Sequence, residues 1–149
     1  MKALKNKKGM AYVLTCVLVM VGMMMVSVLF QYRYVRSIVT TQKEAAQMEL
    51  DSVILKSAVE HYDALKQGSA YQGYINYTKL EQDAYDALGF DDTDEDRQYI
   101  LTNPQITQLT EGGFGLTVTY DLVIPFYALG ENYGNITVPV TVSSQFTEK

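Results

Sequence analysis

The chain has 149 residues, 48% of them hydrophobic, which is enough for one small domain, and its formal net charge is −5. The residues from Gln31 onward carry 17 acidic and 8 basic side chains, a formal charge of −9. This acidic balance argues against a nucleic-acid-binding groove, and the single cysteine, Cys16, permits no internal disulfide.

The first predicted element is a transmembrane helix over residues 10–30. No side chain between Gly9 and Phe30 is charged, and these 22 residues make roughly 33 Å of helix, close to the ~30 Å hydrocarbon core of a bilayer. The run is longer than the apolar part of a secretory signal, and no small-x-small cleavage site follows it. Cys16 lies near the start of the run, so we interpret it as a packed thiol rather than a lipid-attachment site.

Residues 1–9 form a short basic leader before the span. It contains four lysines, Lys2, Lys5, Lys7 and Lys8. The positive-inside rule predicts that the leader stays in the cytoplasm and that residues 31–149 form an extracytoplasmic domain. Arg33 and Arg36 oppose this orientation only weakly, because the lysines outnumber them and Arg side chains reach lipid head groups.

The helix is predicted to continue past the membrane, from about Met10 to about Gln67, with Gly68 as its C-terminal stop. Beyond Phe30 its apolar residues recur mostly every three or four positions and form one amphipathic stripe. They are Val35, Ile38, Val39, Ala46, Leu50, Val53, Ile54, Ala58 and Leu65.

A short second helix is predicted from Lys79 to Leu88. Thr78 followed by Glu81 fits a capping box at its start, and Gly89 closes it.

Two antiparallel strands are predicted in GFGLTVTYDLVIPFY and GNITVPVTVSSQF, because apolar and polar side chains alternate in both. The turn-forming residues of ALGENYGN join them. Pro139 lacks an N–H, which predicts a sheet edge or a bulge there. QYILT and ITQLT, on either side of Asn103-Pro104, predict one or two further short strands. The predicted fold is therefore α+β, a long N-terminal helix packed on a small C-terminal antiparallel sheet.

The chain has twelve tyrosines and no tryptophan. Tyr32 and Tyr34 directly follow the span and are typical of an interfacial aromatic belt. The others, Tyr127 and Tyr133 among them, fit either a contact surface or partial burial under loops.

No motif in the sequence predicts catalysis. Asp92, Asp94 and Asp96 have the spacing that begins a calcium loop, but Arg97 stands where the turn glycine belongs. His61, the sole histidine, has no cysteine or second histidine partner for a zinc site. We therefore expect no enzymatic activity, no cofactor and no metal ligand.

The order of these elements is similar to the plan of type IV pilins and pseudopilins. More narrowly, KKGMAYVLT and TVTYDLVIPFYALGENYGNITVPVTVSSQFTEK resemble TadE-like minor pseudopilins of tight-adherence (Flp-type) pilus systems. The resemblance implies that a prepilin peptidase cuts between Gly9 and Met10 and that the subunit joins other pilin-like subunits. The chain departs from the family at Leu14, where pilins generally carry a glutamate that pairs with a neighbouring subunit's new amino terminus.

Two classes of function follow. The first is a single-pass, membrane-anchored, pilin-like structural subunit of a surface pilus, adhesion or related secretion assembly. The second is a membrane-tethered extracytoplasmic binding domain that does not polymerise. Processing of the Gly9–Met10 bond distinguishes them, because only the first class requires a prepilin peptidase.

Overall fold

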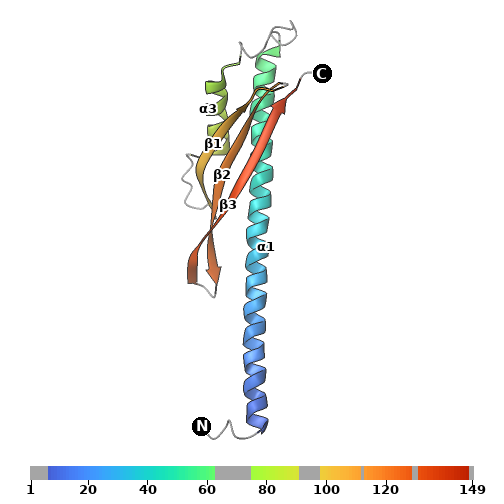
Figure 1. Ribbon diagram of the computed structural model, residues 1–149, viewed down its shortest axis with the longest axis vertical. Helices are drawn as coiled ribbons and strands as arrows, with labels where there is room; N and C mark the ends of the chain where they lie inside the picture. Colours follow the sequence, from blue (N-terminus) through green and yellow to red (C-terminus); the bar gives the residue numbers. More distant parts are fainter. Residues whose placement is uncertain (1–6, 63–74, 91–97, 112, 129–130, 148–149) are drawn as a thin grey trace.

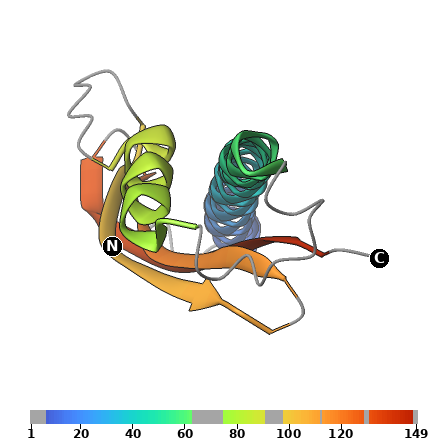
Figure 2. The same ribbon diagram turned by 90° about the horizontal axis from the view of Figure 1, so that it is seen from above.

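The computed structural model describes residues 7–62, 75–90, 98–111, 113–128 and 131–147. The elements are, in chain order, α1 (Lys7–Glu60), α3 (Tyr77–Leu88), β1 (Ile100–Leu109), β2 (Phe114–Ala128) and β3 (Glu131–Phe146). Figure 2 shows both helices on the same face of the sheet, and Figure 1 shows that α1 extends far beyond the sheet toward the N-terminus. The predicted α+β arrangement of one long N-terminal helix and a small antiparallel sheet is confirmed.

Helix α1 is continuous over 54 residues, with no proline to interrupt it. The predicted amphipathic stripe is confirmed, since Ala46, Leu50, Ile54 and Ala58 are buried and the apolar residues that precede them on this face are partly buried. The helix starts at Lys7, slightly before the expected start. Its expected end near Gly68, with Leu65, lies outside the described residues.

The sheet has the order β1-β2-β3 with antiparallel neighbours, so β2 is its central strand. The predicted alternation is confirmed, because every second residue of β2 points into the core, where the two helices cover the sheet. Val140 and Val142 of β3 join this core. The buried hydrophobic side chains of β2 are those of Phe114, Leu116, Val118, Tyr120, Leu122 and Ile124.

Asn103-Pro104 does not separate two short strands, because both residues lie within β1. The pairing register shifts between Thr102 and Gln105, which marks a β-bulge. Asn103 has φ 53°, a conformation that asparagine tolerates better than most residues, and its Nδ2 donates to Asp121 Oδ2 at 3.0 Å. The bulge thus accommodates the proline without ending the strand.

Helix α3 begins earlier than predicted, at Tyr77. Its N-cap is Asn76, whose side chain accepts a hydrogen bond from Lys79 N at 3.2 Å, so the prediction of Thr78 as the cap is wrong. Asparagine is at least as good an N-cap as threonine, and the earlier start adds Tyr77 to the core-facing side of the helix. The stop at Gly89 is confirmed, with φ 68° in the left-handed region.

Pro139 lies on an edge strand. The sequence predicted either a sheet edge or a bulge at this residue, and the edge is confirmed. It pairs with Asp121 in an unbroken stretch of register, so no bulge is present at that position. Part of this edge is covered by α1, because Gln47 Nε2 donates to the Ser143 carbonyl at 2.8 Å. Helix α1 thereby contacts both the face of the sheet and its edge strand β3.

Candidate membrane span and interaction surfaces

The N-terminal half of α1 presents apolar side chains in every direction. No residue between Gly9 and Phe30 is buried, and the large apolar side chains of this segment are 46% to 76% exposed. Thr15 Oγ1 donates to the Ala11 carbonyl at 2.9 Å, so its hydroxyl is satisfied within the helix without water. The helix is long and apolar enough to cross a membrane.

The residues of the expected processing site lie inside this helix. Gly9 and Met10 belong to the first turns of α1, so no helix boundary separates leader from span at this bond. Leu14 is 67% exposed one turn further on, and Cys16 is also exposed. All four residues therefore lie on the uncovered part of α1, where no described side chain from the rest of the chain shields them.

Polar residues begin directly after the apolar segment. The side chains of Arg33 and Arg36 are exposed, and so are those of Tyr32 and Tyr34. Tyr34 also makes the first polar contact between α1 and the rest of the domain, because its hydroxyl donates to Gln98 Oε1 at 2.8 Å. The change from an uncovered to a packed helix thus occurs within a few residues of the expected membrane surface.

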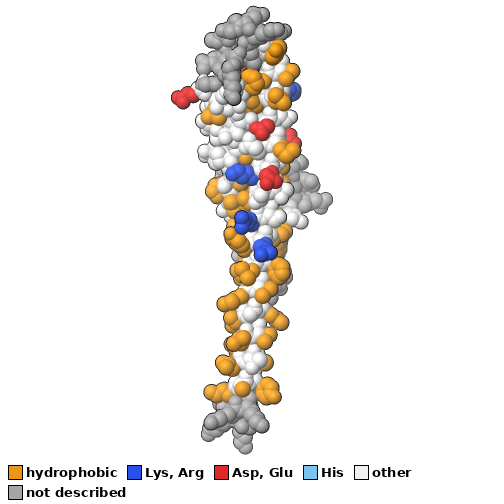
Figure 3. Space-filling model, turned by 90° about the vertical axis from the view of Figure 1, so that its right-hand side faces the viewer, with side chains coloured by type: hydrophobic (Ala, Val, Ile, Leu, Met, Phe, Trp, Pro, Cys, Tyr) orange, Lys and Arg blue, Asp and Glu red, His pale blue; other side chains and the backbone are white. Residues whose placement is uncertain are grey.

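A second apolar stripe lies on the back of α1, away from the sheet. Met48, Leu55 and Val59 are 72%, 60% and 68% exposed. Spacings of seven and four residues place them on one side of the helix, roughly opposite the buried Leu50 and Ile54. We call these three residues the back stripe. Figure 3 shows hydrophobic side chains on the upper part of this face, separated from the apolar lower part by a band of charged side chains.

The sequence prediction missed the back stripe. The stripe that packs on the sheet already explains the helical periodicity of the apolar residues. The exposed apolar residues outside it were therefore not identified as a second stripe. The available signal was the presence of three large apolar side chains at positions that a one-sided amphipathic helix would fill with polar residues.

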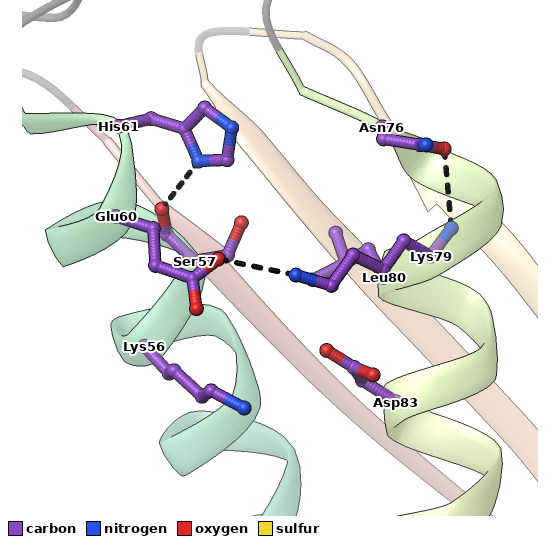
Figure 4. Close-up of a pocket in the computed structure, with 8 residues that line it drawn as sticks. All are labelled: Lys56, Ser57, Glu60, His61, Asn76, Lys79, Leu80 and Asp83. Atoms are coloured by element: carbon purple, nitrogen blue, oxygen red, sulfur yellow. Dashed lines mark hydrogen bonds and ion pairs between the residues drawn. The ribbon is translucent and has the colours of Figure 1, made fainter.

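A polar cleft of about 240 Å³ lies between the C-terminal part of α1 and the start of α3 (Figure 4). Lys79 Nζ lies 3.4 Å from Glu60 Oε2 across it, and both side chains are well exposed, so this ion pair adds little stability. His61 Nδ1 lies 2.8 Å from the backbone carbonyl of Ser57, not from its hydroxyl. The cleft therefore holds no hydrogen-bonded pair of serine nucleophile and histidine base.

The described part of the chain has no cluster of three or more His, Cys, Asp or Glu side chains suited to a metal ion. The acidic run Asp92, Asp94 and Asp96 lies outside the described residues. Among the described residues, His61 belongs to no such cluster.

Tyr120 is the titratable group with the clearest change in pKa. It is 1% exposed, and burial raises its pKa to about 12, with a further rise from neighbouring Tyr99 and a smaller opposing effect of the Gln42 side chain. Gln42 Oε1 accepts from the Tyr99 hydroxyl at 2.7 Å, whereas no described residue makes a well-formed hydrogen bond with the Tyr120 hydroxyl. Tyr120 is a core residue rather than a reactive one, since it faces Phe90 edge-on.

Comparisons of the chain with protein-family models, with curated proteins and with solved structures find no match. The resemblance to TadE-like pseudopilins therefore remains a prediction from the order of the elements and from the quoted segments.

Proposed function

We propose that this protein is a non-enzymatic, membrane-anchored, pilin-like subunit of a surface pilus, adhesion or related secretion assembly, similar in plan to TadE-like minor pseudopilins. In this proposal residues 1–9 lie in the cytoplasm, residues 10–30 cross the membrane, and residues 31–149 lie outside it. Its partners are the membrane and other pilin-like subunits, with a prepilin peptidase as its processing enzyme and no nucleic acid.

The observation that carries the proposal is the continuity of α1. The same helix is uncovered and apolar in its first half and packed on a sheet in its second half. A flexible linker between anchor and domain would let the domain reorient, whereas an unbroken helix holds it at a fixed height above the bilayer. This rigidity suits a building block that must present the same surfaces to each neighbour.

The back stripe supports contact with other subunits. Met48, Leu55 and Val59 are exposed on the side of α1 that the sheet leaves open. Exposed apolar side chains that line up along one helix face are typical of an interaction surface. A domain that works as a monomeric tether has no structural need for this stripe.

Leu14 suggests a specialised position in the assembly. A leucine enters an apolar helix bundle, but it cannot pair with the new amino terminus of a neighbouring subunit, so a charge would stay unpaired at every contact in a filament core. We therefore expect an accessory subunit present in few copies rather than the repeating unit of a filament core.

The first test is intact mass and N-terminal sequencing of the protein isolated from its native membrane. The proposal predicts a chain that begins at Met10. A chain that retains Met1 or Lys2 contradicts the prepilin-type processing, and a start near Gln31 contradicts the membrane anchor itself.

The second test is photo-crosslinking from the back stripe. We expect a benzoylphenylalanine at Val59 to form adducts with a second copy of this chain or with another pilin-like subunit in the membrane. The matched control is the same group at Thr141, an exposed residue on the opposite side of the domain. Absence of adducts from Val59 in a correctly anchored chain favours the non-polymerising tether.

A further inference from the structure

The β2–β3 hairpin extends past the rest of the sheet toward the N-terminal end of α1 (Figure 1). Strand β1 begins at Ile100, which pairs with Val123, while β2 continues to Ala128. These five further residues, at about 3.3 Å each, make roughly 16 Å of hairpin that β1 does not accompany.

The polar contact at the start of β1 gives the height of this hairpin relative to the apolar segment. Gln98, two residues before β1, accepts the hydrogen bond from Tyr34. Tyr34 is only four residues, or about 6 Å of helix, beyond Phe30. The part of the hairpin that β1 does not accompany is longer than this interval, so it is long enough to reach the level of the apolar segment. Figure 1 agrees, since the hairpin ends at the height of the light-blue turns of α1.

The end of the hairpin carries exposed aromatic side chains and very little charge. Tyr127 and Tyr133 are 49% and 64% exposed. Glu131 is the only charged residue in the sequence between Asp121 and Glu148. Tyrosine has an apolar ring and a polar hydroxyl, which is why it is enriched where hydrocarbon meets lipid head groups.

One of these tyrosines, Tyr133, lies at a β-bulge. Phe126 pairs with Gly134 and Tyr127 pairs with Asn132, which leaves Tyr133 as the extra residue of β3. Gly134 has φ 129°, a conformation that favours glycine, and its N–H donates to Asn132 Oδ1 at 2.8 Å. Tyr133 and its neighbours in β3, from Asn132 to Asn135, are all exposed.

We propose that the end of the β2–β3 hairpin is a second membrane contact, with Tyr127 and Tyr133 in the head-group region of the leaflet from which the domain emerges. This inference rests on the transmembrane span of the proposed function. One helix alone lets the domain tilt relative to the membrane, and a second contact beside it restricts that tilt. The hairpin thereby holds the back stripe at a fixed inclination to the membrane.

The absence of tryptophan from the chain allows a direct test by single-tryptophan fluorescence. Full-length Tyr127→Trp and Tyr133→Trp variants are reconstituted in phosphatidylcholine vesicles with or without brominated acyl chains, which quench tryptophan on contact. Phe30→Trp is the reference for the span. Tyr62→Trp is the matched control, because Tyr62 is equally exposed but lies just past the other end of α1.

We expect blue-shifted emission and strong bromolipid quenching for both hairpin variants, at a level close to that of Phe30→Trp, and no quenching for Tyr62→Trp. Quenching of Phe30→Trp without quenching of either hairpin variant overturns the second contact and leaves the span in place. A blue shift without quenching also overturns it, because the rings then contact protein rather than lipid. Loss of quenching at Phe30→Trp overturns the span and, with it, this inference.

Discussion

The two halves of α1 share one backbone and have opposite surroundings. Leu18, in the first half, is 69% exposed, whereas Leu50, in the second half, is fully buried under the sheet. The first half is apolar on all sides, as a helix in lipid must be, and the second half is apolar mainly where the sheet covers it. The comparison teaches that the distribution of apolar residues around the helix, not their number alone, determines which surroundings each half requires.

The transition between the halves is marked by polar contacts. Tyr34 donates to Gln98, and the Tyr99 hydroxyl donates to Gln42 at 2.7 Å. Further along, Gln47 donates to Ser143. These side-chain hydrogen bonds join the packed half of α1 to β3 and to the residues that precede β1, and each one orients the sheet relative to the helix.

The largest expected effect comes from truncating one buried side chain in the packed half of α1. Leu50→Ala removes buried contacts and leaves a cavity, so we expect the free energy of unfolding to fall by about 2–5 kcal/mol. Leu18→Ala is the matched control and leaves the unfolding of the domain unchanged, because Leu18 contacts no core residue. Denaturant unfolding in detergent micelles, followed by near-UV circular dichroism of the tyrosines, measures both. Equal losses in the two variants contradict the division of α1.

Alanine substitutions at two glycines, one in the sheet and one in the first half of α1, test the same comparison. A Cβ added at Gly115 would lie 2.7 Å from Gln145 Cα and collide with the Ser144 carbonyl, so Gly115→Ala is expected to cost about 1–3 kcal/mol by forcing β2 and β3 apart. A Cβ added at Gly22 meets no atom within 4 Å. Gly22→Ala should therefore leave the domain's melting temperature unchanged, and a loss there as large as that of Gly115→Ala shows that the first half is packed against protein.

The raised pKa of Tyr120 predicts that the packed part of the protein loses stability in alkali. Its pKa is about 12 in the folded chain and about 10 when unfolded, so burial of the neutral phenol stabilises the fold fully below pH 10 and this stability is lost as pH rises toward 12. The loss is on the order of 2 kcal/mol. Tyr120→Phe should abolish this part of the pH dependence and be neutral or slightly stabilising at pH 7, because it removes a poorly partnered buried hydroxyl.

Unfolding titrations of both chains from pH 8 to pH 12 provide the measurement. The other tyrosines and the lysines also titrate in this range, so the difference between the two chains is the relevant quantity. An identical pH dependence in the two chains contradicts the raised pKa.

The smallest expected effect concerns α3, which covers the distal part of α1 only. Asn76→Ala removes the hydrogen bond to Lys79 N and should destabilise the domain by about 1 kcal/mol. Thr78→Ala is the control, since Thr78 is exposed and does not cap the helix, and should change the melting temperature less. If Thr78→Ala lowers the melting temperature more than Asn76→Ala does, Thr78 is the cap, as the sequence predicted.

Much of the fold was predictable because its periodicities are strong. Residues at Ala46, Leu50, Ile54 and Ala58 repeat at helical spacing, and the alternation along β2 specifies its buried face, so both layers follow from local pattern. The α3 cap was predicted wrongly, because Asn76 and Thr78 are both residue types that cap helices and only packing of the helix on the core decides between them.

The surfaces were less predictable than the core. The bulge at Asn103 depends on pairing with β2, and the reach of the hairpin depends on how far β1 and β2 differ in length, which no single segment reveals. The back stripe was hidden by the stronger stripe on the opposite side of α1. For the bulge and the hairpin, the missing information is a relation between elements distant in sequence.

The most direct test of the central claim, one helix in two surroundings, uses the chain's only cysteine. Intact cells that express the full chain are treated with a membrane-impermeant maleimide, and the same is done with a Cys16→Ser, Ser52→Cys variant whose new thiol lies at an exposed position of the packed half. We predict rapid labelling of Ser52→Cys and no labelling of Cys16 until the membrane is dissolved and the chain is denatured. Labelling of Cys16 in intact cells at the rate of Ser52→Cys would contradict the account, because the first half of α1 would then lie in water.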